Sequence, residues 1–416
     1  MTKKLYGIST LLVTMAALFA VIVYRFHIFD GLNAFTYIMP FDLRIYQLAG
    51  EDLLAGGNLY DNPYIANFPF TYPPFAGLVF MLLPALGDSL IIAWPAAIYA
   101  ALLAIIIMIL RERGVRITPA VLLVAVALTA LTPANESIHG TQYYGQINVF
   151  LMLLVAFDLL PLKWRLPGVG TGLAAGLKLT PAYMGLALLF ERRWWAALGS
   201  IITFLVTVII GFMFVPDAKV FWTDAMFNSS RVGEHANPGA KSLRSLMYRV
   251  FGIDGGVWWI LAVLAVFALT CLALRTAYKH GNRSAALAMT GLSACLVSPF
   301  SWYHHFIWTV PFGIVVFVAT NQALGTRLTG RFGAQLAGLL SVLALVVVEL
   351  PFMSAPVWFA ASSGNLDHIE SFQPWAMSLW TMSCVIYIAA YAAWGFISPK
   401  SSTASTASTQ GRHAAA

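Results

Sequence analysis

Residues 89–116 read SLIIAWPAAIYAALLAIIIMILRERGVR, an uncharged apolar run followed by a segment that carries three arginines. As a helix, the stretch from 89 to 110 is long enough to cross the roughly 30 Å hydrocarbon core of a bilayer. Lys and Arg concentrate in the cytoplasmic loops of membrane proteins, so Arg111, Arg113 and Arg116 indicate that this helix ends at the cytoplasm. The stretch therefore predicts a membrane-spanning helix and its direction.

The composition extends this interpretation to nearly all of the 416 residues. Hydrophobic residues make up 60% of the chain, charged residues only 10%, and the mean hydropathy is +0.78. Soluble domains carry roughly 25% charged residues, so the sequence predicts an all-α polytopic membrane protein with one transmembrane domain over residues 1–398. The low-complexity residues 399–416 are expected to form a disordered cytoplasmic tail. We expect about ten full spans, near residues 5–24, 89–110, 117–133, 147–162, 194–215, 257–275, 284–298, 306–320, 333–350 and 374–396.

Basic residues divide unevenly between the two sides that these spans define. With both termini in the cytoplasm, the cytoplasmic segments hold 16 of the 24 basic and 3 of the 17 acidic residues, a net +13 against −6 outside. This asymmetry predicts the orientation in the plasma membrane and accounts for the basic composition without nucleic acid as a partner. Residues 5–24 lack a small-residue cleavage site, so we expect an uncleaved first span.

Two apolar stretches do not fit as full spans. Residues 73–87 are too short to cross, and residues 166–190 have cytoplasmic-type basic residues on both sides. We expect 166–190 to be a pair of short helices, broken at Thr180, with Lys178 at the tip. A lysine at membrane depth either faces a polar cavity or snorkels to an interface, and the sequence leaves both open. Small residues at four-residue spacing favour close packing of the first half: Gly168, Gly172 and Gly176.

The first polar segment outside, FDLRIYQLAGEDLLAGGNLYD (41–61), gathers several acids in a chain that has few. Pro40 suits a first helical position and Gly56 ends the pattern, so Asp42 is expected in the first turn of a helix along the membrane. The helix dipole favours the ionised carboxylate there, and Asp42 is either a functional acid or one that caps the helix or compensates its dipole. The other acids flank a glycine-rich turn and are expected to be solvated: Glu51, Asp52 and Asp61.

The segment SPFSWYHHFIW (298–308) places two adjacent histidines, His304 and His305, at the mouth of a span. Helical neighbours point about 100° apart, so the pair does not favour a shared metal ion. A hydrogen-bonding or phosphate-facing imidazole and an interfacial structural histidine both fit the pattern. The sequence contains no H-E-x-x-H, Walker loop, D-x-D pair or Cys/His ligand spacing, so we expect no protein-held metal and no other cofactor. The three cysteines lie inside apolar runs and are expected to be core residues: Cys271, Cys295 and Cys384.

Several of these motifs together resemble glycosyltransferase family 87 of the GT-C superfamily. The resemblance covers roughly residues 35–320 and rests on PFDLRIY, FTYPPF, GQINVFL, GLAAGLKLTP followed by ERRWW, SSRVG followed by SLRSLMYR, and SPFSWYHHFIW. It is similar in particular to the actinobacterial polyprenyl-phosphate-mannose-dependent α-1,2-mannosyltransferases that build phosphatidylinositol mannosides and lipoarabinomannan. Where the family often reads Asn-Gln-Ser-Leu before its arginine, this sequence reads NPGAKSL, so the loop around Lys241 and Arg244 departs from the pattern.

The resemblance implies a GT-C-type bundle with its catalytic loops on the extracytoplasmic face. The implied reaction is inverting transfer of mannose from polyprenyl-phosphate-mannose to a lipid-linked mannoside acceptor. By similarity, Asp42 is the general base. The other residues that the resemblance implies are catalytic His304 and His305 and substrate-binding Tyr72, Gln146, Asn148, Lys178, Arg231 and Arg244. Of these, the cations and histidines are candidates for the donor phosphate, and Gln146 and Asn148 either bind sugar hydroxyls or hold the site together.

Two other classes of protein stay open at this point. One is a secondary transporter or flippase of a lipid-linked sugar, and the other is a lipid-linked polymer ligase. Transporters usually place their binding residues near the bilayer midplane between repeated halves. In this sequence the ionisable residues other than Lys178 cluster at one face, which favours the transferase.

Overall fold

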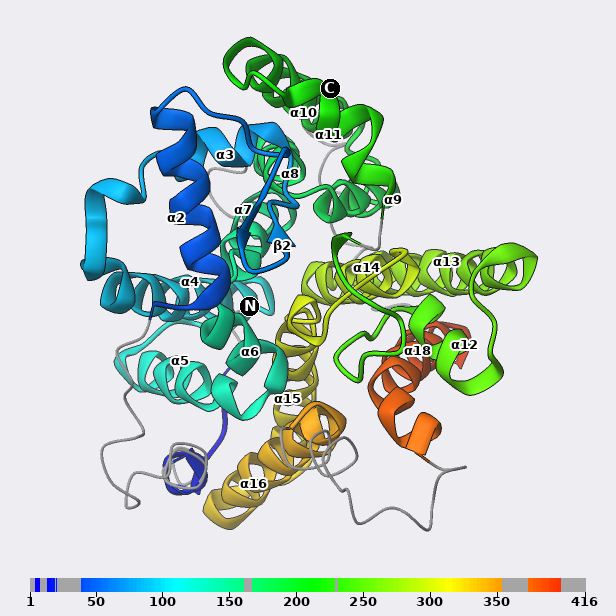
Figure 1. Ribbon diagram of the computed structural model, residues 1–416. Coiled ribbons are helices and arrows are strands. Elements are labelled where there is room, and N and C mark those ends of the chain that lie inside the picture. Colours follow the sequence, from blue (N-terminus) through cyan, green and yellow to red (C-terminus); the bar gives the residue numbers. More distant parts are fainter. Residues whose placement is uncertain are drawn as a thin grey trace, which may run out of the picture.

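The computed structural model describes residues 4–7, 13–18, 20, 39–160, 167–228, 231–353 and 373–397. Within these ranges the regular structure is helical, apart from a short antiparallel hairpin of β1 (Pro63–Ile65) and β2 (Phe68–Pro69) (Figure 1). The helices are α2 Phe41–Leu54, α3 Pro74–Phe80, η2 Pro84–Ser89, α4 Leu90–Glu112, α5 Pro119–Leu131, η3 Thr132–Ala134, α6 Glu136–Tyr144, α7 Asn148–Leu159, α8 Val169–Leu177, η4 Thr180–Met184, α9 Gly185–Phe190, α10 Trp194–Phe214, α11 Ala218–Thr223, η5 Ala225–Phe227, α12 Leu243–Phe251, α13 Gly256–Lys279, α14 Arg283–Val297, η7 Tyr303–His305, α15 Thr309–Gly325, α16 Gly330–Glu349, η8 Leu350–Phe352 and α18 Gln373–Ile397. The prediction of an all-α membrane protein is confirmed.

Five helices in the described part of the chain are long and apolar enough to cross a membrane. They are Pro84–Glu112, Trp194–Phe214, Gly256–Lys279, Gly330–Phe352 and Pro374–Ile397. Four more of the predicted spans are apolar helices, but these are shorter: Pro119–Ala134, Asn148–Leu159, Arg283–Val297 and Thr309–Gly325. A 12-residue helix such as α7 is only about 18 Å long, so the span predicted from hydropathy is longer than the helix. The expected first span at 5–24 and the tail at 399–416 lie mostly or wholly outside the described residues, and the full count of ten spans stays a prediction.

The outer surface of the long helices suits contact with lipid. On α10 the side chains of Trp195 and Ile209 are exposed, and on α13 those of Trp258 and Leu264 are exposed as well. Exposed apolar side chains on this scale are unfavourable in water but not against acyl chains. The molecule is therefore organised as a membrane protein, with its polar segments concentrated in the connections between helices.

The predicted pair of short helices at 166–190 is confirmed. Helix α8 ends at Leu177, Lys178 is extended with φ −154° and ψ 130°, and η4 and α9 then continue the chain. The three spaced glycines face α10, because an added Cβ would approach atoms of Ala196, Ser200 and Thr207 to 2.5 Å or less. Glycine is required here for two helices to pack at this distance. The stretch at 73–87 is likewise short, forming α3 and η2.

The helix that carries Asp42 is α2, and it begins one residue later than expected. Pro40 is the residue before the helix, with ψ 140°, and its carbonyl accepts the hydrogen bond of the Arg44 amide. Asp42 lies in the first turn, as predicted, and the chain leaves the helix at Gly56 with φ +78°. The acids expected to be solvated are exposed: Glu51, Asp52 and Asp61.

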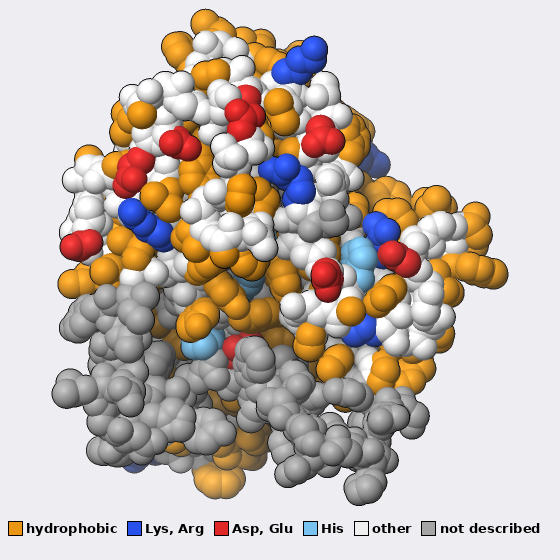
Figure 2. All heavy atoms as spheres, viewed as in Figure 1, with side chains coloured by type: hydrophobic (Ala, Val, Ile, Leu, Met, Phe, Trp, Pro, Cys, Tyr) orange, Lys and Arg blue, Asp and Glu red, His pale blue; other side chains and the backbone are white. Residues whose placement is uncertain are grey.

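Helix packing brings the polar connections toward one face. Helix α14 packs against α13 and α15, α15 packs against α16, and α13 packs against α18, while α2 packs against α3 on the other side of the molecule (Figure 1). Figure 2 shows this face with its side chains coloured by type, and acidic side chains gather around α2 on its upper half. Of the three cysteines, Cys295 and Cys384 are buried, as expected, and Cys271 is partly buried.

Candidate active site

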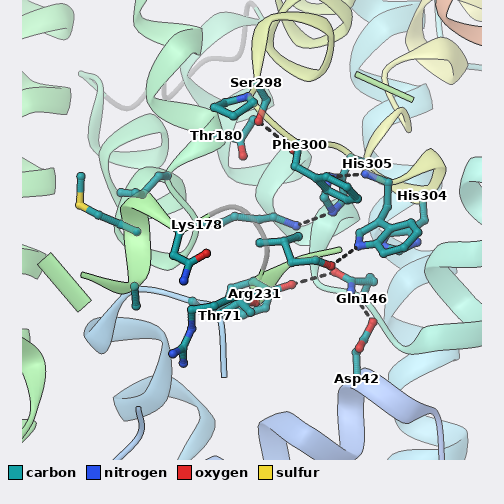
Figure 3. A pocket seen from close by; sticks show the side chains of 18 of the residues that line it. Asp42, Thr71, Gln146, Lys178, Thr180, Arg231, Ser298, Phe300, His304 and His305 are labelled. Atoms are coloured by element: carbon teal, nitrogen blue, oxygen red, sulfur yellow. Dashed lines mark hydrogen bonds between the residues drawn. The ribbon is translucent and has the colours of Figure 1, made fainter. Parts of the chain in front are cut away.

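A cavity of about 1120 Å³ lies where the polar connections meet. It collects residues from α2, the segment after β2, the turn after α6, the break between α8 and η4, the loop before α12, and η7. The cavity brings together eight of the nine residues that the sequence singled out: Asp42, Tyr72, Gln146, Lys178, Arg231, Arg244, His304 and His305. The ninth, Asn148, lies directly behind the wall, where it contacts Lys178 and the backbone of His304. In Figure 3, Asp42 lies at the bottom of the view and Thr180 and Ser298 at the top.

Asp42 is held by a chain of hydrogen bonds from residues distant in sequence. Gln146 Nε2 donates to Asp42 Oδ2 at 2.5 Å, and Tyr72 OH donates to Gln146 Oε1 at 2.8 Å (Figure 3). The hydroxyl of Tyr46 lies 2.7 Å from that of Tyr72 and extends the chain into the core. These bonds fix the orientation of the carboxylate and leave its second oxygen available to the cavity.

A left-handed glycine makes this contact possible. Gly145 ends α6 with φ +71°, and Gln146 then donates its amide to the Thr141 carbonyl, the arrangement of a Schellman motif. A Cβ on Gly145 would lie 2.6 Å from Leu43 Cβ. The bare glycine therefore lets the first turn of α2 approach the end of α6, which places Asp42 beside Gln146.

Burial makes the Asp42 carboxyl a weaker acid than an aspartate in water. Desolvation raises its pKa to about 6, and the hydrogen bond from Gln146 and the charge of Lys178 oppose part of that rise. A carboxyl with a pKa near the working pH is suited to accept a proton during a reaction. Asp42 is also the acidic residue of the first turn of α2, the position in which a carboxylate compensates the helix dipole.

Lys178 faces the cavity and is fixed by two neighbours. Its Nζ donates to Asn148 Oδ1 at 2.9 Å and lies 3.2 Å from His305 Nε2. His305 Nδ1 accepts the Trp302 amide, so in the neutral ring the proton is on Nε2. The ammonium group and this ring N–H are then two donors that face each other, and an anion that accepts from both would satisfy them. These contacts agree with the alternative in which Lys178 faces a polar cavity.

His304 is the clearest unsatisfied group at the cavity. It is buried, and neither Nδ1 nor Nε2 has a hydrogen-bond partner among the described residues. Its backbone is nevertheless tightly held, because its carbonyl accepts from Thr141 Oγ1 at 3.1 Å and from Asn148 Nδ2 at 2.9 Å. Burial and the nearby Lys178 lower its pKa well below the usual histidine value. A neutral imidazole with two free nitrogens next to a cavity is expected to bind a ligand.

The two arginines differ in their readiness to bind a ligand. Arg231 Nε and Nη2 are buried and have no partner among the described residues. Arg244 Nε, by contrast, donates to Asp254 Oδ1 at 2.8 Å, and its guanidinium lies over the Trp259 ring at 5.8 Å. Arg231 therefore has free donors for an anion, whereas Arg244 is already neutralised on one edge.

Several residues of the site were not singled out by the sequence. Trp302 resembled an ordinary interfacial aromatic residue, but its Nε1 donates to the Val232 carbonyl and it forms a bridge with Ala240. Lys241, in the loop that departs from the family pattern, donates its Nζ to the Met377 carbonyl of α18. The Trp302 contacts tie the arginine-bearing loop to the histidine segment, and the Lys241 contact ties it to α18. The signal in the sequence was the clustering of aromatic residues before His304, which alone does not distinguish a site from a membrane interface.

Gln146 and Asn148 hold the site together. Gln146 bridges Tyr72 and Asp42, and Asn148 bridges Lys178 and the His304 carbonyl. Within the described ranges, no group of three or more His, Cys, Asp or Glu side chains lies close enough to hold a metal ion. The arrangement therefore presents one carboxylate and a set of cations and imidazoles to a shared space.

Comparison with known proteins gives consistent similarities. Residues 70–299 match the model of glycosyltransferase family 87. A polyprenol-phosphate-mannose-dependent alpha-(1-2)-phosphatidylinositol pentamannoside mannosyltransferase of Mycolicibacterium smegmatis is 34% identical over 71% of this chain and 75% of its own length. Its counterpart in Mycobacterium tuberculosis strain CDC 1551 is 33% identical over 71% of this chain and 72% of its own. A phosphatidylinositol mannoside mannosyltransferase of M. tuberculosis H37Rv is 31% identical, with coverages of 66% and 69%. No solved structure matches the chain.

Proposed function

Because the chain belongs to glycosyltransferase family 87, we propose that it transfers mannose from polyprenyl-phosphate-mannose to a lipid-linked mannoside acceptor, with formation of an α-1,2 linkage. The observation that carries this proposal is the juxtaposition of Asp42 with Lys178, Arg231, His304 and His305 around one cavity. A sugar transfer from a phosphate carrier needs both a base and an anion site, and the cavity supplies both.

In this reaction Asp42 and the cations of the cavity have separate roles. Asp42 accepts the proton of the acceptor hydroxyl as its oxygen forms a bond to the anomeric carbon of mannose. The bond from that carbon to the phosphate oxygen breaks, and polyprenyl phosphate leaves with both electrons. The carrier phosphate passes from one negative charge to two, while Asp42 becomes neutral. Attack from the face opposite the phosphate inverts the configuration at the anomeric carbon.

The departing phosphate is the group that requires stabilisation in the transition state. Lys178 Nζ and His305 Nε2 lie 3.2 Å apart at the cavity, and Arg231 has guanidinium nitrogens without a partner among the described residues. Such fixed donors stabilise charge that develops during a reaction without having to reorient. His304, with its unpartnered ring, can donate to a phosphate oxygen or accept from a sugar hydroxyl.

The apolar part of the same cavity suits the prenyl chain of the donor. Leu179 and Tyr183 of the short helix pair and Val297 at the end of α14 line it. The predicted +13 and −6 division of charge supports an extracytoplasmic position for these connections. The donor lipid would thus enter from the membrane with its phosphate toward Lys178.

The test uses the purified full chain in lipid nanodiscs. Polyprenyl-phosphate-mannose labelled in the sugar is supplied with phosphatidylinositol mannosides that carry different numbers of mannoses. We expect label in the acceptor lipid, removable by a mannosidase specific for α-1,2 linkages. Absence of transfer to every acceptor, together with movement of the labelled donor across vesicle membranes, would identify a flippase and overturn the proposal.

A further inference from the structure

An exposed pair of phenylalanines lies beside Asp42 at the edge of the cavity. Phe68 of the hairpin is 52% exposed, and its ring meets that of Phe41, the first residue of α2, at 5.0 Å and an interplanar angle of 84°. Both rings line the cavity. The turn residues beside Phe68, Ala66 and Asn67, are exposed as well, so the tip of the hairpin lies at the surface. A half-exposed aromatic pair in such a setting requires an explanation, because burial of either ring elsewhere would be favourable.

The backbone of the hairpin supports a specific placement of Phe68. Its strands pair Ile65 with Phe68, and the turn between them has Ala66 at φ +50°. An alanine in this left-handed conformation costs on the order of 1 kcal/mol or more, and such strain persists only where the surroundings impose it. The strained turn presents Phe68 to the ring of Phe41 and to the cavity.

The chemistry of inversion determines which substrate lies near this pair. The attacking hydroxyl and the leaving phosphate oxygen approach the anomeric carbon from opposite sides. The phosphate belongs with Lys178, Arg231 and His305, and the hydroxyl belongs with Asp42. The ring that carries the hydroxyl must therefore extend from Asp42 away from the cations. The cavity residues near Asp42 include Phe41, its neighbour at the start of α2, and the ring of Phe68 from β2 packs on that of Phe41.

We propose that Phe41 and Phe68 form a platform for the accepting sugar ring of the mannoside. This inference rests on the proposed function and adds the acceptor site to it. A pyranose ring has a face of C–H groups and carries its hydroxyls around the rim. A flat aromatic ring buries the C–H face and leaves the hydroxyls free for water and for Asp42. A lipid chain fits this place less well, since it would remove the neighbouring Asp42 carboxylate from water.

The platform predicts a selective effect on the acceptor. In Phe68→Ala, the KM for the acceptor should rise about tenfold, because one aromatic contact contributes roughly that factor to affinity. The KM for polyprenyl-phosphate-mannose should stay within twofold of that of the unmodified protein. Phe68→Tyr, which keeps the aromatic face, should restore the acceptor KM, whereas Phe68→Leu, which keeps only apolar area, should not.

The matched control is Phe251→Ala. Phe251 is 58% exposed, at the end of α12, and does not line the cavity, so this variant should retain all kinetic constants. Melting temperatures in nanodiscs show whether each variant is folded. If Phe68→Ala is not folded, the acceptor KM values of Phe68→Tyr and Phe68→Leu test the platform instead. An inactive unmodified protein would overturn the proposed function itself. An active protein in which the Phe68 variants behave like Phe251→Ala, or in which they raise the donor KM instead, would overturn the platform alone.

Discussion

At the residue scale, Asp42 derives its chemistry from its surroundings. The same carboxylate in water would be a weak base, but burial raises its pKa to about 6 and the bond from Gln146 fixes its direction. Asp52, in the same helix, is exposed and represents the solvated alternative. The contrast between these two acids of one segment allows the role of Asp42 to be tested.

Replacement of Asp42 by asparagine should abolish transfer while preserving the fold. The amide keeps the shape of the carboxylate but cannot accept the proton, and loss of a positioned base costs about 10²- to 10⁴-fold in rate. Asp52→Asn should keep full activity. The measurement is initial rate with labelled donor and mannoside acceptor, together with donor binding by the Asp42→Asn protein. Near-normal turnover in Asp42→Asn would remove this residue from the mechanism.

The acidity of Asp42 also predicts the pH dependence. A general base must be deprotonated, so activity is complete above its pKa and is lost as the pH falls through it. The value of kcat/KM should therefore be level above a pH of about 6 and decline about tenfold per pH unit below it, since the Asp42 pKa is raised to about 6. A profile that stays level down to pH 4.5 would contradict this assignment, provided that the protein stays folded there by circular dichroism.

At the scale of elements, the broken helix pair of α8, η4 and α9 delivers a cation to the cavity. Helix α8 can lie against α10 only because its glycines leave the space for the other backbone, and it ends at the residue before Lys178. The position of the lysine is therefore set by the packing of a whole helix, and not only by its two polar neighbours.

A single methyl group on the packed face should disturb both stability and donor binding. In Gly172→Ala the new Cβ would lie 2.5 Å from the Ser200 carbonyl oxygen, and overpacking of this kind costs about 1–3 kcal/mol. We expect a lower melting temperature and a higher donor KM, because displacement of α8 moves Lys178. Gly185→Ala in α9 is the control, since an added Cβ there meets no atom within 4 Å. Equal melting temperatures for the two variants would refute the close-packing argument.

At the scale of the whole molecule, the predicted topology assigns the site to one side of the membrane and most of the basic residues to the other. Arg283 of α14 bonds to Glu191 after α9, and its amide bonds to Glu112 at the end of α4. These groups lie in the connections assigned to the cytoplasm, whereas Asp42 and His304 lie in connections assigned to the outside. The charge division thus agrees with a site that works away from the cytoplasm.

Labelling of single cysteines in intact cells tests this orientation. In a background without the native cysteines, Asp61→Cys should react with a membrane-impermeant maleimide from outside. Arg116→Cys, which is also exposed, should react only after permeabilisation. The reverse pattern would place the cavity in the cytoplasm and remove the extracytoplasmic donor from the proposal.

The sequence by itself determined the features that depend on local chemistry. Apolar length predicts membrane helices, the glycine spacing and the break at Thr180 predict a broken short pair, and the helix signals place Asp42 in a first turn, because each effect acts over a few residues. The resemblance of separate motifs added the family and the choice of site residues. The lengths of the four shorter apolar helices were not predictable, since their ends depend on where the chain turns to meet its neighbours.

Only the tertiary structure decided how those residues act. The bond from Gln146 to Asp42 joins positions 104 residues apart, and the contact of Lys178 with His305 joins positions 127 apart. Burial exists only once these segments pack together. It sets the acidity of Asp42, and it leaves both ring nitrogens of His304 and two guanidinium nitrogens of Arg231 without hydrogen-bond partners among the described residues. The sequence could not rank Arg231 above Arg244 either, because the pairing of Arg244 with Asp254 is a property of the folded loop. Desolvation and long-range contact are consequences of packing, and no local pattern encodes them.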